Sequence, residues 1–344
     1  MIRSDILPVL ALALLGASCG GGGGSSTGGS SGSQLPPGPG VLTVSPLEFV
    51  KITDLEPLGA MNPGGHTIPT DHVYFYYAWT PPAPVNPQPW PVLPVVAPGS
   101  GKVIWILSTQ GQPDQKVQVQ MTGDFFYYLD HVVLDSTIQV DTTVTAGQRV
   151  GQTGPGSAAV DLGVIYNAVT LPGFVNPARY GESLHADSPF KYFAEPLKTQ
   201  LYAKVRRNAP DKDGKIDYDV RGRLIGTWFH ESVAVADSMG PTAWPKQLAI
   251  CPDANEPTQM RVSTGGFCGL MGLWNASPGD PDPATVSIAS GKVAFHLLYT
   301  PGGTQRAGLL IVQILDDTRI RLQVFPGSAA DNAEFTGSAL IYTR

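Results

Sequence analysis

Short hydrophobic runs, most of them broken by glycine or proline, recur along the chain after residue 40. They are rich in β-branched and aromatic residues, as in the segment 73–77, VYFYY, which reads as a buried strand. Apolar and polar residues alternate in 116–121, which is typical of a strand with one buried face. The pattern predicts a β domain over residues 41–208. From residue 222 onward, strand-like runs recur every 8–12 residues or so, which predicts an antiparallel β-barrel or sandwich over 209–344.

Only one stretch has helical periodicity, at the end of the first predicted domain. Asp187 and Ser188 precede Pro189, a pattern typical of a helix start. The apolar residues that share one helical face are Phe190, Phe193, Leu197, Leu201 and Val205. Because proline interrupts a helix, Pro196 predicts two short helices here. The expected fold class is therefore mainly β, with a short helical segment.

The first forty residues indicate export. The apolar stretch 6–15 is too short to span a bilayer, so residues 1–18 are expected to be a signal peptide. The letters LGASC, which end at Cys19, resemble a bacterial lipoprotein processing site and imply that Cys19 is lipidated. The alternative is an ordinary secretory signal. Gly20 after the cysteine implies the outer membrane if the host has one, and residues 19–40, mostly Gly, Ser and Pro, are expected to form a flexible tether.

Charge and cysteine content narrow the classes further. The net charge of −6 and the lack of a basic stripe argue against a nucleic-acid partner. Besides Cys19, the chain has only Cys251 and Cys268. In an exported protein this pair predicts a disulfide, and the alternative is two buried free thiols.

Candidate chemistry gathers in the segment 64–77, GGHTIPTDHVYFYY. His66, Asp71 and His72 offer donor atoms that zinc prefers. Pro69 forbids a helix between the two histidines, which places them on a loop and on the first residue of a strand. The alternative is that His72 forms hydrogen bonds inside a β core while His66 lies in a glycine-rich turn.

Two phrases further along resemble a known family. Residues 95–103 read V-x-A-P-x-x-G-K-V and residues 144–154 read V-x-A-G-Q-x-V-G-x-x-G. Together with the histidine segment they resemble the lysostaphin-type (LytM-like) zinc endopeptidases, which cleave peptide cross-links in bacterial cell walls. The resemblance covers residues 64–166 and implies a duplicated-hybrid-motif β domain that binds zinc.

The resemblance also implies roles for particular residues. His66 matches the family's first histidine, and the aspartate expected four residues later falls on Thr70, so that Asp71 and His72 are the neighbouring candidates for metal ligands. His131 matches the histidine that handles the attacking water, although Leu129 stands where the family has tyrosine.

The final His-x-His of the family falls on Asp161-Leu162-Gly163. Glycine has no side chain to coordinate with, so Gly163 removes one metal ligand. Asp161, as a carboxylate on the same strand, is the candidate replacement. The expected metal set is therefore His66, Asp71, His72 and Asp161, with His131 as the catalytic candidate.

Three functions remain open at this stage. The missing final histidine favours a non-catalytic, membrane-anchored lipoprotein of the cell envelope, which binds cell-wall peptide or regulates a wall hydrolase. The first alternative is an active zinc-dependent peptidoglycan endopeptidase with a rearranged His/His/Asp site. The second is a carrier of a small apolar ligand, because Gly226-Thr227-Trp228 resembles the opening strand of lipocalin-type barrels, in which Arg319 or Arg321 would cover the tryptophan.

Overall fold

The computed structural model describes residues 35–81, 83–108, 111, 113–299, 304–327 and 329–344. The predicted signal peptide, Cys19 and most of the predicted tether lie outside the described residues. Among those that are described, no helix has the length and hydrophobicity needed to cross a lipid bilayer.

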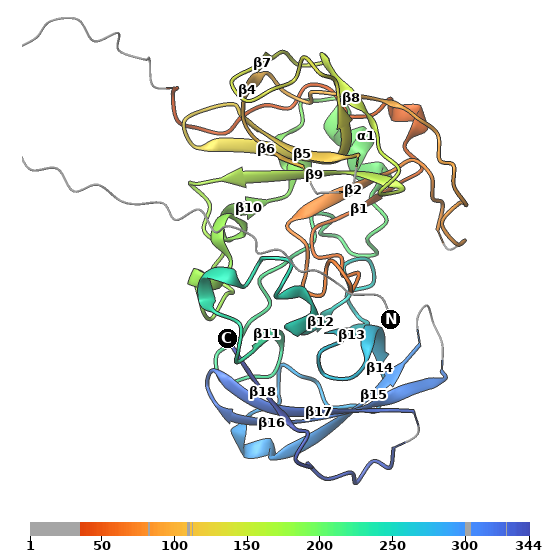
Figure 1. Ribbon diagram of the computed structural model, residues 1–344, viewed down its shortest axis with the longest axis vertical. Helices are drawn as coiled ribbons and strands as arrows, with labels where there is room; N and C mark the ends of the chain where they lie inside the picture. The colour runs from red at the N-terminus through yellow and green to blue at the C-terminus, as the bar shows by residue number, and fades with distance from the viewer. Residues whose placement is uncertain (1–34, 82, 109–110, 112, 300–303, 328) are drawn as a thin grey trace, which may run out of the picture. The chain divides into compact units, whose positions relative to one another are not determined.

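A ten-stranded sheet forms the first half of the described chain (Figure 1). The main path through this sheet runs β1-β2-β9-β6-β5-β4-β7, while β10 pairs with β9, and β8 pairs with β3 and β6. The strands are β1 (Asp54–Glu56), β2 (His72–Tyr76), β3 (Pro94–Val96), β4 (Gly101–Ser108), β5 (Gln115–Gln120), β6 (Phe125–Leu134), β7 (Thr143–Val144), β8 (Arg149–Thr153), β9 (Ala159–Tyr166) and β10 (Ala186–Asp187).

The predicted helical segment is present and is divided as expected. The 3-10 helix η4 (Pro189–Tyr192) is followed by the α-helix α1 (Leu197–Lys204), whose N-cap is Pro196. Phe190 and Leu201 are fully buried against the sheet core. The other 3-10 helices of this half are η1 (Phe49–Lys51), η2 (Pro177–Arg179) and η3 (Gly181–His185).

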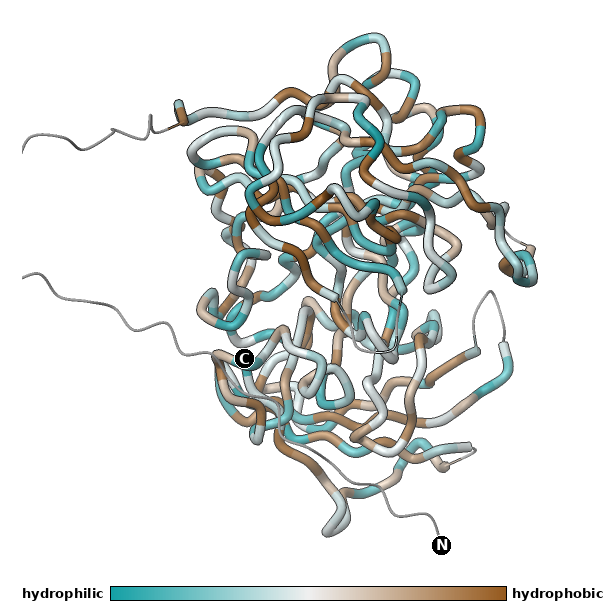
Figure 2. The backbone as a smooth tube through the Cα atoms, turned by 45° about the horizontal axis from the view of Figure 1, so that its top comes forward, coloured by the Kyte–Doolittle hydropathy of each residue, from teal (hydrophilic) through white to brown (hydrophobic). Residues whose placement is uncertain are grey.

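Eight antiparallel strands close into a barrel in the second half (Figure 1). They are β11 (Gly226–His230), β12 (Gln247–Pro252), β13 (Met260–Gly265), β14 (Met271–Ala276), β15 (Lys292–Leu298), β16 (Arg306–Asp316), β17 (Arg319–Pro326) and β18 (Leu340–Thr343), with 3-10 helices η5 (Val235–Asp237), η6 (Trp244–Lys246) and η7 (Ile288–Ser290). The predicted mainly β class is confirmed, and the second part is a barrel. In both halves hydrophobic and hydrophilic stretches alternate over short distances along the backbone (Figure 2).

Large side chains fill the barrel interior. Trp228, Phe295 and Tyr342 are fully buried there within one hydrophobic cluster. The residue that covers Trp228 is Arg344, whose guanidinium carbon lies 3.7 Å from the ring centroid. The expectation that Arg319 or Arg321 would do so was wrong, because Arg319 pairs with Asp316 on the surface and Arg321 stacks on Phe335.

The predicted disulfide between Cys251 and Cys268 is also wrong, since both thiols are free. Successive residues of β12 face opposite sides of the barrel wall. Ile250 therefore points into the barrel cluster, while Cys251 points outward, where its Sγ lies 3.7 Å from Met61 Sδ. Cys268 packs against the barrel cluster instead, so the two thiols belong to different cores.

The outward face of β11 and β12 continues the core of the sheet. Phe229, Ala249 and Cys251 belong to the same buried cluster as Phe75 and Leu162. Sheet and barrel thus share one hydrophobic core, which fixes the chain between β11 and β12 beside the sheet.

Candidate metal centre

The strand pairing of β2 and β9 brings His72 and Asp161 together. His72 lies opposite Gly163, and Tyr74 lies opposite Asp161, so His72 and Asp161 are diagonal neighbours on one face of the sheet. Most residues of both strands are buried, which holds the two side chains on a rigid support.

His66 reaches the same place from the loop before β2. Asn62 and His66 form an isolated antiparallel bridge, with hydrogen bonds of 2.8 and 3.0 Å between their backbones. Gly64 closes this turn with a φ of 116°, a conformation that favours glycine. The turn fixes the direction in which His66 leaves the backbone.

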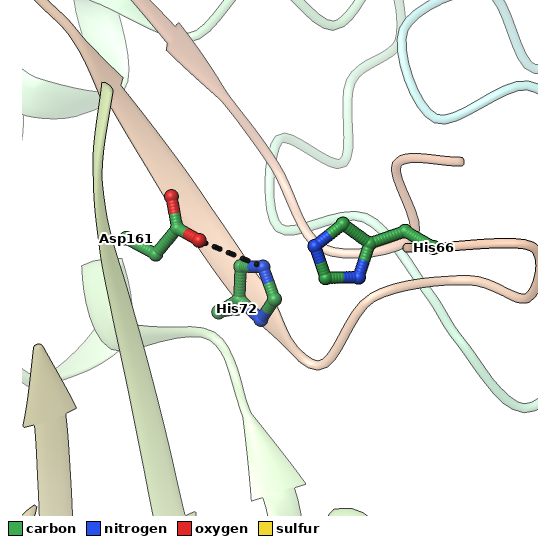
Figure 3. A group of neighbouring side chains, drawn as sticks. All are labelled: His66, His72 and Asp161. Atoms are coloured by element: carbon green, nitrogen blue, oxygen red, sulfur yellow. Dashed lines mark ion pairs between the residues drawn. The ribbon is translucent and has the colours of Figure 1, made fainter. Parts of the chain in front are cut away.

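The three side chains converge on one point (Figure 3). His66, His72 and Asp161 each offer a ligand atom, and these atoms lie within 4.8 Å of one another. His72 Nε2 is 3.3 Å from Asp161 Oδ2, and the rings of His66 and His72 have centroids 5.2 Å apart. Two imidazoles and a carboxylate with an open side are the ligand set of a catalytic zinc site.

The state of these residues fits a bound cation. Asp161 is 1% exposed, and its Oδ1 has no hydrogen-bond partner in the described part of the chain. Burial raises the pKa of this carboxyl above its ordinary value, and the opposing charges of His72, His131 and Lys116 do not offset it. Burial and the neighbouring His72 lower the pKa of His66 to about 3, so its imidazole is neutral, the form that binds metal.

Asp71 lies outside this group and contacts the far ring nitrogen of His72. Its Oδ1 is 3.1 Å from His72 Nδ1 and accepts a hydrogen bond of 2.6 Å from the hydroxyl of Tyr128, while Ser183 donates to Oδ2. Burial opposes ionisation of Asp71, but the hydrogen bond and charge of His72, with Lys116 and Ser183, hold the pKa of its carboxyl well below the usual range. A carboxylate on the far nitrogen of a ligating histidine fixes its tautomer and orientation.

Tyr128 fills the place of a side chain at position 163. A Cβ on Gly163 would lie 2.2 Å from the Tyr128 ring, so no other residue fits there unless the ring moves. Burial raises the pKa of Tyr128 well above its ordinary value, so its hydroxyl stays protonated and donates to Asp71. The absence of a side chain at Gly163 therefore leaves the space that the Tyr128 ring occupies.

His131 lies at the edge of the group and has its own orienting carboxylate. Its Nδ1 is 3.0 Å from Asp114 Oδ2, and its Nε2 is 3.6 Å from Asp161 Oδ2. The backbone of His131 has a φ of 62°, which is uncommon for a residue other than glycine and occurs often at functional sites. Burial would lower the pKa of His131, but the carboxylates of Asp161, Asp130 and Asp114 raise it above its ordinary value.

Two glycines leave the space that the Asp114 side chain occupies. A Cβ on Gly154 or Gly156 would lie 2.6 or 2.2 Å from atoms of the Asp114 side chain. The sequence analysis missed Asp114 and Tyr128 as parts of the site. Asp114 lies in a loop 17 residues before His131 and belongs to no recognised motif.

A cleft of about 820 Å³ opens over these residues. Its floor includes His66, His72 and His131. One wall of the cleft comes from the segment between β11 and β12, which includes Trp244. This segment contacts the loop that carries His66, because the hydroxyl of Thr67 donates a hydrogen bond of 3.0 Å to the carbonyl of Trp244. The group therefore lies where a substrate of moderate size can reach it.

Neither a family model nor a curated protein matches the sequence. Solved structures are similar over part of the chain. The catalytic domain of lysostaphin from Staphylococcus simulans is 17% identical over 40% of this chain and 87% of that chain, with a TM-score of 0.27. Helicobacter pylori Csd3 is 17% identical over 38% and 33%, with a TM-score of 0.28, and a zinc-containing peptidase from Vibrio cholerae is 16% identical over 37% and 37%, with a TM-score of 0.27.

The chain spans about a third of the length of Csd3.

Proposed function

We propose that this chain is a metal-dependent peptide hydrolase that acts on bacterial cell-wall peptide, with zinc held by His66, His72 and Asp161. The observation that carries the proposal is the buried carboxylate of Asp161, whose Oδ1 lacks a partner among the described residues beside two imidazoles. A buried carboxylate oxygen without a hydrogen-bond partner is costly, and a cation bound at this point would reduce that cost.

The choice of cell-wall peptide rests on the sequence resemblance to the lysostaphin-type enzymes. The same resemblance favoured a non-catalytic role, because Gly163 supplies no ligand. The geometry supports catalysis better, since His72 and Asp161 complete a set of three donors with His66 and leave His131 outside that set.

Zinc bound at this point would polarise a substrate carbonyl and lower the pKa of a water molecule. The chain's own residues prepare the donors. Asp71 accepts a hydrogen bond from His72 Nδ1–H, so that the lone pair of Nε2 is directed at the cluster. The protonated hydroxyl of Tyr128 donates to the same oxygen, Asp71 Oδ1, and lies 3.1 Å from His72 Nδ1.

His131 is the residue suited to proton transfer. Asp114 accepts a hydrogen bond from its Nδ1 and leaves Nε2 free to take a proton in the cleft and later release it to a leaving group. A carboxylate in this position also stabilises the imidazolium that forms. Tyr74 also lies beside the cluster, with its hydroxyl 3.1 Å from His72 Nε2.

The test begins with metal content. The purified protein, dialysed against zinc, is expected to bind one ion, and His66→Ala or Asp161→Asn should weaken binding by roughly 100-fold or more. His230→Ala is the matched control, because His230 lies on β11 of the barrel, outside the metal candidates, and its Nδ1 is 2.9 Å from Ser232 Oγ. A wild-type protein that binds no zinc would exclude the proposal.

Catalysis is tested separately by release of peptide from purified cell wall. His131→Gln should lower the rate by roughly 10²–10⁴-fold while leaving zinc affinity unchanged. If the wild type binds zinc but neither cleaves wall nor responds to His131→Gln, the site is a binding site only, as the sequence resemblance first suggested.

A further inference from the structure

The floor of the cleft is a row of side chains that crosses five strands. Pairing places His72 opposite Gly163, Gly163 opposite Tyr128, Tyr128 opposite Gln118, and Gln118 opposite Trp105. Directly paired residues point to the same face of a sheet. The row therefore leads from the metal candidates on β2 and β9, over β6 and β5, to Trp105 on β4.

The length of this row sets the size of what can lie on it. Neighbouring strands are about 4.8 Å apart, so β4 lies roughly 14 Å from β9. An extended peptide rises about 3.3 Å per residue, so roughly four residues span this distance. The substrate would lie across the strands, with its reacting bond at one end of the row.

The far end of the row is apolar and exposed. Trp105 is 42% exposed and Leu107 is 47% exposed, and both line the cleft. Met239, 36% exposed, lines the cleft from the segment between β11 and β12. Exposed large apolar side chains that gather in a cleft are typical of a binding subsite.

Between the two ends lies a cation without an acidic partner. Lys116 on β5 lines the cleft, and its Nζ lies 3.6 Å above the ring of Tyr128. In the described part of the chain, no carboxylate lies within ion-pair distance of this ammonium group, although Asp71 and Asp130 also line the cleft. Its charge contributes to the pKa shifts of His66 and Asp71, so it acts in the same space as the metal candidates.

We infer that the cleft selects a peptide that carries a carboxylate for Lys116 and, about four residues from the reacting bond, an apolar side chain for Trp105 and Leu107. This inference rests on the proposed function for the position of the reacting bond. The preference itself belongs to residues outside the metal candidates. The carboxylate comes from an acidic side chain or from the free end of the peptide, and both present the same group to the ammonium.

The experiment measures binding to the metal-free protein by calorimetry, so that zinc and cleavage play no part. Four acetylated pentapeptides, Ala-Ala-X-Ala-Leu, carry Glu or Gln at X and end in a carboxylate or an amide. Hydrogen bonds to charged groups are stronger than those between neutral groups, so we expect a peptide with a carboxylate to bind about tenfold or more tightly than the neutral one. The two positions of the carboxylate distinguish its sources.

Lys116→Met should abolish this difference, and Lys116→Arg should retain it. Lys102→Met is the matched control, because Lys102 lies on β4 outside the cleft lining and pairs with Asp141 at 2.6 Å. Trp105→Ala should weaken the binding of all four peptides several-fold, because each ends in leucine.

Equal binding of charged and neutral peptides by the wild type would overturn the inference, as would a charge preference that persists in Lys116→Met. Failure of all four peptides to bind at millimolar concentration would overturn it as well. A loss of zinc binding in His66→Ala with the peptide preference intact would leave both proposals standing, because the two readouts are separate.

Discussion

Removal of the Tyr128 hydroxyl tests whether the hydrogen bonds among Tyr128, Asp71 and His72 orient the metal candidates. Tyr128→Phe keeps the ring that fills the space at Gly163 and deletes only the hydroxyl that donates to Asp71 at 2.6 Å. A hydrogen bond to a buried charged group contributes about 1.5–3 kcal/mol, so the free energy of unfolding should fall by that amount. Asp71 would keep His72 and Ser183 as partners, which sets the lower end of this range.

The same change should weaken zinc binding. Partners of a ligating histidine commonly contribute 10–100-fold to metal affinity, and the Tyr128 hydroxyl contacts both Asp71 and, at 3.1 Å, His72 Nδ1. Competition with a chromophoric chelator measures the affinity, and urea unfolding of the metal-free protein measures stability.

Tyr127→Phe is the matched control. The neighbouring hydroxyl is also buried, but it donates to the neutral carbonyl of Gly99 at 3.0 Å and faces the other side of the sheet. Its loss should cost about 0.5–1.5 kcal/mol of stability and leave zinc affinity unchanged. If both variants bind zinc as tightly as the wild type, the role given to Tyr128 and Asp71 is refuted.

Three further predictions test other parts of the chain. Gly163→Ala should displace the Tyr128 ring and lower the free energy of unfolding by about 1–3 kcal/mol, as urea unfolding would show, and an unchanged midpoint would contradict the close packing. Cys19→Ala should release the protein from membranes on detergent partitioning, because several acyl chains anchor firmly, and unchanged partitioning would exclude lipidation at Cys19. The hydrogen bond and charge of Asp280 raise the pKa of His296, so the stability that His296 adds over His296→Gln should be present at pH 5.5 and fade as the pH rises towards 8.5. Urea unfolding at both pH values measures it, and a difference between the two proteins that does not change with pH would contradict this pairing.

The sequence predicted the parts of this fold that depend on local patterns. Residues 73–76 of the predicted strand lie in β2, and Pro196 lies between the two short helices as the N-cap of α1. The regular strand spacing after residue 222 corresponds to the barrel. These features follow from backbone sterics and side-chain alternation, which act over a few residues.

Features that depend on contacts between distant segments were missed or wrongly predicted. Asp114 and Tyr128 enter the site only because β5 and β6 pair beside β9. The cysteines were expected to pair because they are few, yet strand alternation turns Cys251 away from the core that Cys268 contacts. Arg344 reaches Trp228 because β18 closes the barrel against β11, a pairing that no local pattern encodes.

The hydrogen bond from Thr67 to Trp244 couples metal binding near His66 to the stability of the barrel. The loop that carries His66 packs against the segment between β11 and β12, and both contribute residues to one hydrophobic core with the sheet. Any ion that binds the folded loop and not the unfolded chain therefore stabilises the barrel too. At a free concentration one hundred times its dissociation constant, this adds about 2.7 kcal/mol to unfolding of the whole unit. A thermal melt followed through Trp228 inside the barrel would then report metal bound on the far side of the shared core.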